Sequence, residues 1–223
     1  MRTKYFSFHL PMLMFMAWLL SACAAKVMDN SQLQYIAPEF TDNSLPEHGL
    51  SLLPIVAGHG QEGLRRPLGA KLDSNLTNQL PEGKFIATIP TLDLINEANL
   101  TEAYAQMIDD YARAAILNKK TLRQIGEATG IRYLLHVKLL DQSHTETVGP
   151  ALLSDEIINV QIRNVSIFGQ VWDCDLGDIV WEGTGEAMVR TEVEVQYLKH
   201  SIEDLVNIAA RSFLNNLPGI KIS

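Results

Sequence analysis

The sequence predicts a single α/β domain, an α/β sandwich in which helices pack on a mixed β-sheet. Three observations predict it: helical periodicity through the middle of the chain, two long β-rich runs in succession, and an amphipathic segment near the end. In this arrangement the apolar face of each helix packs against a face of the sheet, so the helices cover the sheet. The expected order is β-α-β-α-α-β-β-β-α.

The first residues have the organisation of an export signal. Residues 1–22 carry two basic residues and no acid before the apolar run Leu10–Leu20. Eleven apolar residues are too few for a membrane-spanning helix and suit a signal peptide. The run ends in Leu-Ser-Ala-Cys at 20–23, which resembles the lipobox of bacterial lipoprotein precursors. We therefore expect cleavage before Cys23 and lipidation of its thiol.

Lipidation would place the protein on a membrane. Acyl chains such as palmitate on Cys23 give stable anchoring once there is more than one of them. Ala24 stands where enterobacterial sorting reads an aspartate as an inner-membrane signal, so the resemblance implies the outer membrane, with the domain in the periplasm. The alternative is an ordinary secretory signal cut after Ala22 or Ala25, with Cys23 unmodified.

Composition bounds the class of protein. The formal net charge is −8, and it becomes −10 without the two bases of residues 1–22, since 16 bases then face 26 acids. An acidic surface argues against nucleic acid as a partner. After Cys23, only Cys174 remains, so no disulfide can form within the domain. Cys174 is expected to be small and partly buried, with pairing to another chain as the alternative.

The domain is expected over residues 50–223. Residues 23–49 are predicted to be the lipidated cysteine and a flexible tether, because they are polar and show no sustained period. The predicted elements are, in order, strand Leu50–Val56, helix Leu64–Leu80, strand Phe85–Ile89, helix Thr101–Ala115, helix Leu122–Ala128, strand Tyr133–Leu140, the polar loop Gln142–Glu156, strands Ile158–Trp172 and Ile179–Val189, and helix Ile202–Leu214.

Periodicity and end signals define the helices. Five leucines recur every fourth residue from Leu64 to Leu80, so they share one helical face. Thr101 suits a helix start, and Gly130 suits the left-handed position after a helix end. Pro90 closes the short strand before Thr101.

The strands differ in how they alternate. Tyr133–Leu140 is almost continuously apolar, as in a central strand covered on both faces. Residues 179–189 alternate apolar and polar side chains, so the two faces of that strand differ. Asp173–Asp178 has turn chemistry, which predicts an antiparallel hairpin between the last two strands.

Three segments resemble a known group of envelope proteins. They are Thr121–Leu135 (TLRQIGEATGIRYLL), the hairpin Gln170–Gly183 with Trp172-Asp173 and Trp181-Glu182, and Leu53-Pro54-Ile55. The chain resembles periplasmic lipoproteins whose domain is similar to the amino-terminal domain of TolB, a group that includes CsgG and LpoB. The resemblance spans residues 50–217. It implies a fold and a location but no single activity, because members bind different partners.

No catalytic or metal-binding pattern is found. After residue 22 the histidines are scattered, with no ligand spacing: His48, His59, His136, His144 and His200. His136 is expected to be hydrogen-bonded or to face the surface. Asp173, Asp175 and Asp178 resemble a fragment of a calcium loop, but a solvated turn explains them better. We expect no enzyme, no cofactor and no metal.

Two functions are compatible with these features. The favoured one is a non-catalytic binding module that is held at the outer membrane and serves a periplasmic envelope-assembly or cell-wall partner. Its partner-binding candidates are Val148, Leu152 and Leu153 in the polar loop, unless these side chains fold back on the sheet. The alternative is a structural subunit of an envelope oligomer or secretion complex, as in CsgG, for which a homo-oligomer is expected.

Overall fold

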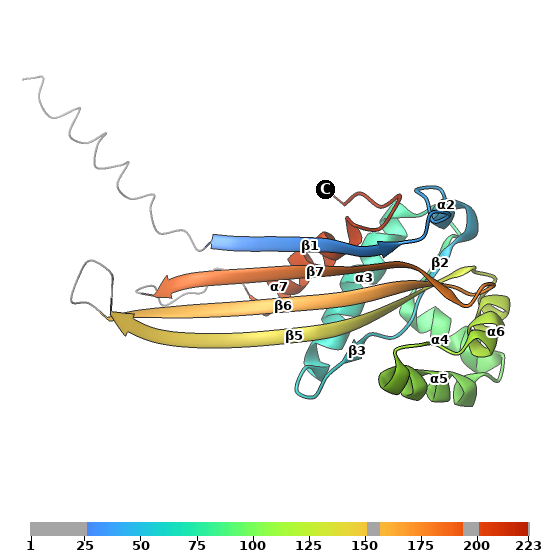
Figure 1. Cartoon of the computed structure of the whole chain (residues 1–223), viewed down its shortest axis with the longest axis horizontal. Coiled ribbons are helices and arrows are strands. Elements are labelled where there is room, and N and C mark those ends of the chain that lie inside the picture. The colour runs from blue at the N-terminus through green and yellow to red at the C-terminus, as the bar shows by residue number, and fades with distance from the viewer. Residues whose placement is uncertain (1–25, 151–156, 194–200, 223) are drawn as a thin grey trace, which may run out of the picture.

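A seven-stranded mixed sheet with helices on both faces forms the framework of the chain (Figure 1). This computed structural model describes residues 26–150, 157–193 and 201–222. In chain order the elements are β1 (Lys26–Ile36), α2 (Ser44–His48), β2 (Leu50–Leu52), β3 (Val56–Ala57), the 3-10 turn η2 (Glu62–Leu64), α3 (Arg65–Gln79), β4 (Phe85–Ile86), α4 (Thr88–Glu97), α5 (Thr101–Ala114), α6 (Lys119–Thr129), β5 (Tyr133–Pro150), β6 (Ile157–Asp173), β7 (Asp178–Val193) and α7 (Ile202–Leu214). The predicted α/β class with a mixed sheet is confirmed.

The sheet has a long antiparallel part and a short parallel part. The strand order is β1-β7-β6-β5-β2-β4, with β3 also beside β5. β1, β7, β6 and β5 are antiparallel neighbours, whereas β2, β3 and β4 are parallel to their partners. The predicted β6–β7 hairpin is therefore confirmed, and β1 is an edge strand among the described residues.

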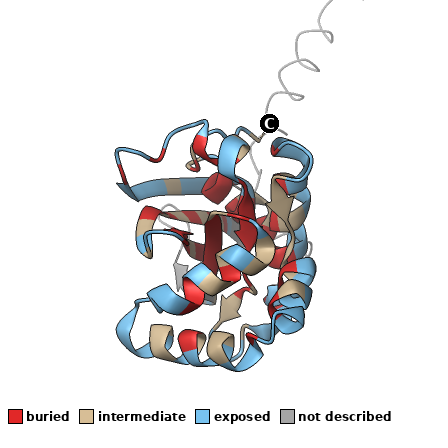
Figure 2. Ribbon diagram, turned by 90° about the vertical axis from the view of Figure 1, so that its right-hand side faces the viewer, coloured by how far each residue is buried: buried red, intermediate tan, exposed pale blue. Residues whose placement is uncertain are grey.

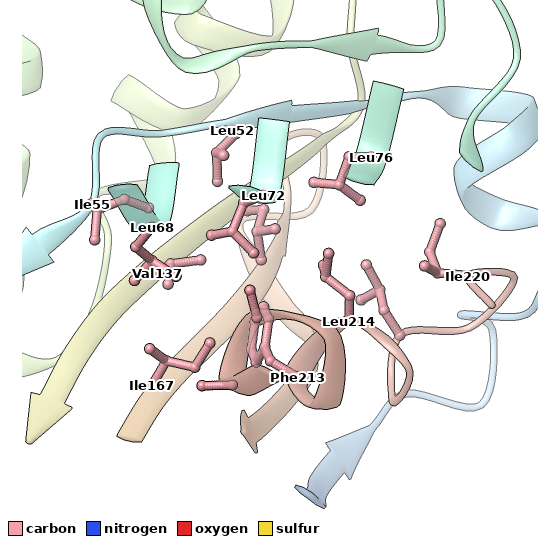
Figure 3. Close-up of a cluster of buried hydrophobic side chains, with 14 of the residues drawn as sticks. Leu52, Ile55, Leu68, Leu72, Leu76, Val137, Ile167, Phe213, Leu214 and Ile220 are labelled. Atoms are coloured by element: carbon pink, nitrogen blue, oxygen red, sulfur yellow. The ribbon is translucent and has the colours of Figure 1, made fainter. Parts of the chain in front are cut away.

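One face of the sheet is covered by α3 and α7. The leucines of α3 meet Phe213 and Leu214 of α7 over strands β5 and β6 (Figure 3). Gly169 and Gly185 let α7 approach the sheet, since a Cβ at either position would stand about 2.4–2.5 Å from the Phe213 side chain. Trp181 is fully buried and packs edge-on against Phe213 at 5.3 Å. Trp181 therefore belongs to the core between the sheet and α7.

The other face is covered at one end only. α4, α5 and α6 pack there over a second apolar cluster that includes Leu53, Leu134, Trp172 and Cys174. Figure 1 shows β1, β5, β6 and β7 running on beyond these three helices. In the turned view of Figure 2 the buried residues lie between the layers, and the outer faces of the helices are exposed. The helix-covered end of this face is where the candidate site lies.

The helix ends have clear causes in the sequence. Asn118 Oδ1 accepts the backbone N–H groups of Lys120 and Thr121 at the start of α6, and Gly130 ends it at φ 68°. Ser201 and Asp204 form a capping box at the start of α7. α7 therefore begins at Ile202 and α6 ends before Gly130, as the sequence predicts, whereas α6 begins at Lys119, three residues before the predicted Leu122.

Three sequence predictions are wrong. The tether over 23–49 is replaced from Lys26 onward by β1 and then α2, because β1 completes the sheet beside β7. The loop Gln142–Glu156 is strand as far as Pro150, because it pairs with β6. The strand Phe85–Ile89 stops at Ile86, and an unpredicted helix, α4, begins at Thr88.

No helix among the described residues is long and apolar enough to cross a membrane. Residues 1–25 lie outside the described part, so the signal peptide and the lipidation of Cys23 stay predictions.

Candidate functional site

A groove on the helix-covered end of the second sheet face is the candidate site, and we name it the Tyr35 groove. Its volume is about 490 Å³. Its walls come from β1, the α5–α6 connection, β6 and the start of β7. It is lined by Tyr35, Ile116, Trp172, Gly177, Asp178, Ile179 and Glu182.

The groove exposes apolar side chains that the fold itself does not cover. Tyr35 is 48% exposed and Ile116 is 64% exposed. Leu176, next to the lining residue Gly177, is 41% exposed. Scattered single apolar residues on a surface are ordinary, but apolar residues from separate elements around one hollow are typical of a binding surface.

Three elements bring these side chains together for identifiable reasons. β1 has a bulge between Leu33 and Tyr35, after which Tyr35 pairs with Glu182. α5 ends at Ala115 in the left-handed conformation, so the chain turns sharply and Ile116 protrudes. Leu117, which follows, is buried in the second cluster and holds this turn against the domain.

A series of side-chain hydrogen bonds holds Glu182, the acidic residue in the wall of the groove. Gln170 Nε2 donates to the Glu182 carboxylate at 2.7 Å. Gln170 Oε1 accepts from the Tyr111 hydroxyl at 2.9 Å and from Trp172 Nε1 at 3.3 Å. Burial, and then the charge of Glu182, raise the pKa of Tyr111. Gln170 thus ties α5 to the sheet and orients Glu182, whose carboxylate has lone pairs left for a ligand.

His136 lies next to Tyr111 of this hydrogen-bond series and is fully buried. Its ring packs edge-on against Tyr111 at 4.3 Å. Neither ring nitrogen has a hydrogen-bond partner among the described residues. Burial, with a smaller contribution from Lys138, lowers the pKa of His136 to about 4. The expectation of a hydrogen-bonded or surface histidine is wrong, because α5 seals His136 against the sheet.

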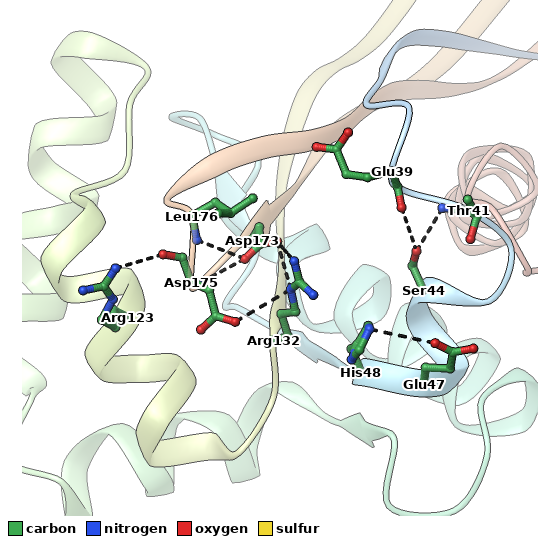
Figure 4. A network of polar contacts seen from close by, with 10 residues as sticks. All are labelled: Glu39, Thr41, Ser44, Glu47, His48, Arg123, Arg132, Asp173, Asp175 and Leu176. Carbon is green, nitrogen blue, oxygen red and sulfur yellow. Dashed lines mark hydrogen bonds and ion pairs between the residues drawn. The ribbon is translucent and has the colours of Figure 1, made fainter.

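An ion pair fixes the turn at the end of the groove. Arg132 donates through Nε and Nη2 to Asp173 Oδ2 at 2.9 and 2.8 Å (Figure 4). Asp173 Oδ1 accepts the backbone N–H groups of Asp175 and Leu176. The hydrogen bonds to Asp173 raise the pKa of Arg132. The idea of a fully solvated turn is wrong for Asp173, which is buried, and the turn places Leu176 beside the groove.

Of the predicted partner-binding and lipidation residues, the structure describes only the backbone of Val148. The backbone of Val148 lies in β5, paired with Asn159 of β6. Leu152 and Leu153 lie outside the described residues, as does Cys23. Cys174 is buried under α6, and burial raises the pKa of its thiol to about 12. In the part of the chain that the structure describes, no three His, Cys, Asp or Glu side chains are grouped to hold a metal ion.

No signal in the sequence marks Tyr35, Ile116 and Glu182 as groove residues. Tyr35 fell in the predicted tether, and Ile116 followed the apolar stripe of a predicted helix. Glu182 was assigned only to the polar face of its strand. These three residues meet because β1 pairs with β7, and no local sequence signal predicts that pairing.

The chain has weak likeness to a few solved structures and to no known family. No family model matches it, and no curated protein matches it. Among solved structures, the PelC dodecamer from Paraburkholderia phytofirmans is 13% identical, with 85% of this chain and 97% of that chain covered and a TM-score of 0.47. Lipoprotein GNA1162 from Neisseria meningitidis is 11% identical, with 67% and 87% covered and a TM-score of 0.37. The hypothetical protein CT253 from Chlamydia trachomatis is 10% identical, with 60% and 67% covered and a TM-score of 0.30. TM-scores below 0.5 assign neither a family nor a function, so the likeness to TolB-like lipoproteins stays a prediction.

Proposed function

We propose that this protein is a membrane-anchored, non-catalytic binding module whose Tyr35 groove holds a segment of an envelope protein. The observation that carries the proposal is the groove itself, where the exposed Tyr35 and Ile116 meet over a fixed carboxylate. Acylation of Cys23 would supply the anchor at the outer membrane, with the domain in the periplasm. The absence of catalytic spacing in the sequence motivates the non-catalytic part.

The chemistry of the groove defines its partner. Tyr35, Ile116 and Ile179 offer apolar contact area, and an aromatic anchor of this kind carries much of the energy in protein interfaces. Asp178 and Glu182 add two carboxylates, and Lys119 lies at the rim with its methylene stem against Gly177. The best-matched ligand is therefore an apolar peptide segment that carries a lysine or arginine for Glu182.

Charge supports the same partner. The whole chain has a formal net charge of −8, so a basic segment would be attracted over distances of up to about 10 Å at moderate salt. Glu182 is held by Gln170 and loses little freedom on binding, which reduces the entropy cost of forming an ion pair.

Site-specific photo-crosslinking in cells tests this proposal. A photoreactive amino acid is placed at Ile116, and a matched control carries it at Ile89, an isoleucine of α4 that is 71% exposed outside the groove. We expect one discrete adduct from position 116 and none from position 89. Tyr35→Ala and Glu182→Gln should each weaken that adduct, because truncating an interface anchor costs about 2 kcal/mol, or roughly thirtyfold in affinity.

The outcomes separate cleanly. An adduct at 116 that persists in both groove variants, or equal adducts at 116 and 89, would contradict binding in the groove. Loss of the adduct in Cys23→Ser would connect binding to the anchor.

A second function, the structural subunit of an envelope oligomer, is favoured by one observation. β1 is an eleven-residue edge strand, and Leu33 and Ile36 on it are 49% and 39% exposed. An open edge of this length can pair with another strand, which proteins commonly prevent by covering or charging it. Mass measurement by light scattering in detergent distinguishes the two, since a monomer excludes the subunit and a discrete larger species supports it.

A further inference from the structure

We infer that the partner segment binds as an added β-strand, paired along the open edge of β1, with successive side chains entering hollows on the two faces of that strand. This inference deepens the proposed function and rests on it. It assigns the partner segment an extended conformation and a second contact surface, on the opposite side of β1 from the Tyr35 groove.

The outer edge of β1 is open. β1 pairs with β7 on one side, and no strand among the described residues pairs with its other side, the upper edge of the sheet in Figure 1. Every residue from Gln32 to Ile36 is exposed, whereas a strand with one covered face alternates between exposed and buried residues. This part of β1 is therefore accessible from the edge and from both faces.

The sequence does little to block this edge. Proteins commonly protect an edge strand with charged residues, proline or a bulge. Asn30–Ile36 contains no charged residue and no proline. It has a bulge, after which Tyr35 pairs with Glu182, whereas Leu33 pairs with Gly183. The bulge therefore turns Tyr35 to the face that carries the groove and leaves Leu33 on the face of α7.

The backbone of Ile36 offers hydrogen bonds at the open edge beside the groove. Ala37 donates its N–H to the carbonyl of Val180, toward β7, at 2.9 Å. Because successive strand residues direct their N–H and C=O groups to opposite sides, those of Ile36 point to the open edge. In strand addition, such main-chain groups supply affinity, and pockets for alternate side chains supply specificity.

β1 has a hollow on each of its faces, which is the pattern that an added strand requires. The Tyr35 groove lies on the face that carries α4–α6. A second hollow of about 400 Å³ lies between β1 and α7 on the other face, and we name it the α7 hollow. Its lining residues include Val27, Asp29 and Ser31 of β1 and Arg211 of α7. A strand beside β1 points successive side chains to opposite faces, so one extended segment can reach both hollows.

The two hollows differ in chemistry, which defines the alternation of the partner segment. Toward the Tyr35 groove, apolar side chains and a lysine or arginine for Glu182 fit best. In the α7 hollow, the exposed Asp29 and Arg211 present one charge of each sign, so polar side chains fit there. From Val27 to Tyr35 the strand advances by eight residues, or about 27 Å, so a segment of about nine residues spans both hollows.

Photo-crosslinking with mapped adducts tests the inference in the full-length protein in cells. A photoreactive amino acid is placed separately at Asn30, Gln34 and Ile116. Gln79, an exposed glutamine of α3, is the matched control for Gln34. Mass spectrometry identifies the partner residue in each adduct. We expect the same partner at positions 30, 34 and 116 and no adduct at 79. The partner residues joined to 30 and 34 should lie about four apart, because paired strands advance together.

The outcomes separate strand addition from groove binding. An adduct at 116 with none at 30 and 34 would overturn strand addition and leave groove binding intact. Adducts at 30 and 34 with partner residues in no regular order would overturn it as well. An adduct at 34 that joins β1 of a second copy would replace the partner strand by self-pairing. Absence of the adduct at 116 would refute the proposed function, and this inference would fail with it.

A backbone substitution tests the edge hydrogen bond directly. Ile36→Pro removes the N–H that points to the open edge and leaves the ladder with β7 intact. Ile36→Ala is the matched control, since it keeps the N–H and removes more of the side chain than proline does. We expect the adduct at 116 to be about fivefold weaker in Ile36→Pro than in Ile36→Ala, as loss of one hydrogen bond predicts. Equal adducts in the two variants would contradict pairing of the partner at Ile36.

Discussion

Replacing His136 with leucine should remove an acid-induced loss of stability. His136 is fully buried between β5 and Tyr111, and neither ring nitrogen has a hydrogen-bond partner among the described residues. The folded protein therefore favours the neutral imidazole, and the pKa falls from 6.5 to about 4. The unfolded chain, in contrast, takes up a proton near pH 6.5.

The sign and the size follow from this difference. Above pH 6.5 His136 is neutral in both the folded and the unfolded state, so its titration does not change the free energy of unfolding. Below that value the unfolded state binds the proton first, so stability falls until the pH reaches about 4. The loss from this one group is about 2 kcal/mol at pH 5 and about 3 kcal/mol at pH 4.

Urea unfolding at pH 7.5 and pH 5 measures the effect. Between these pH values His136→Leu should lose about 2 kcal/mol less than the wild type. The matched control is His59→Leu, which removes a histidine whose side chain is fully exposed. Equal losses in His136→Leu and the wild type would refute the argument that His136 is buried in its neutral form.

Three further substitutions and one labelling experiment test the packing around the groove. Arg132→Ala should lower the free energy of unfolding by about 3 kcal/mol, because it leaves the buried Asp173 carboxylate without its partner. Arg123→Ala, on an exposed backbone contact, should cost less than about 1 kcal/mol in the same urea titration. Gly126→Ala should lower the midpoint of thermal unfolding by several degrees, which corresponds to a loss of about 1–3 kcal/mol in the free energy of unfolding. The reason is that a Cβ at position 126 would stand 2.6 Å from the Cβ of Cys174. An unchanged midpoint would contradict the packing of α6 against Cys174. Cys174 should resist maleimide labelling in the native protein at pH 7 and react in urea, because burial raises its pKa to about 12.

Most helices and the β6–β7 hairpin could be predicted because their signals are local. The leucine spacing of α3, the end of α6 at Gly130 and the turn at Asp173–Asp178 each depend on neighbouring residues alone. α4 was missed because Pro90 suggested a strand end. Pro90 is in fact the third residue of a helix that begins at Thr88, a first-turn position where its missing N–H costs nothing.

Elements that depend on distant partners could not be predicted. The sequence of β1 predicts a tether because its residues facing α7 include the polar Asp29 and Ser31, so its alternation has no clear apolar face. The second half of β5 predicts a loop because it is polar beyond Leu140. On the face that carries α4–α6, the second half of β5 and much of β1 run beyond these helices (Figure 1), so on that face little selects for apolar residues.

The same reason explains why the candidate site was missed. Tyr35 and Ile116 are eighty-one residues apart in sequence, and they meet only because β1 pairs with β7. Val148, in contrast, was selected as an exposed apolar residue in a polar loop, and it belongs to the paired backbone of β5.

Mass spectrometry of the amino-terminal peptide of the mature protein tests the central claim most directly. Purified from membranes and digested, the chain should begin at Cys23, with a diacylglyceryl group on the thiol and an acyl group on the amine. The Cys23→Ser protein should lack this peptide and appear in the soluble fraction. A wild-type chain that begins at Cys23 with a free thiol, or at Lys26, would contradict the membrane-anchored module.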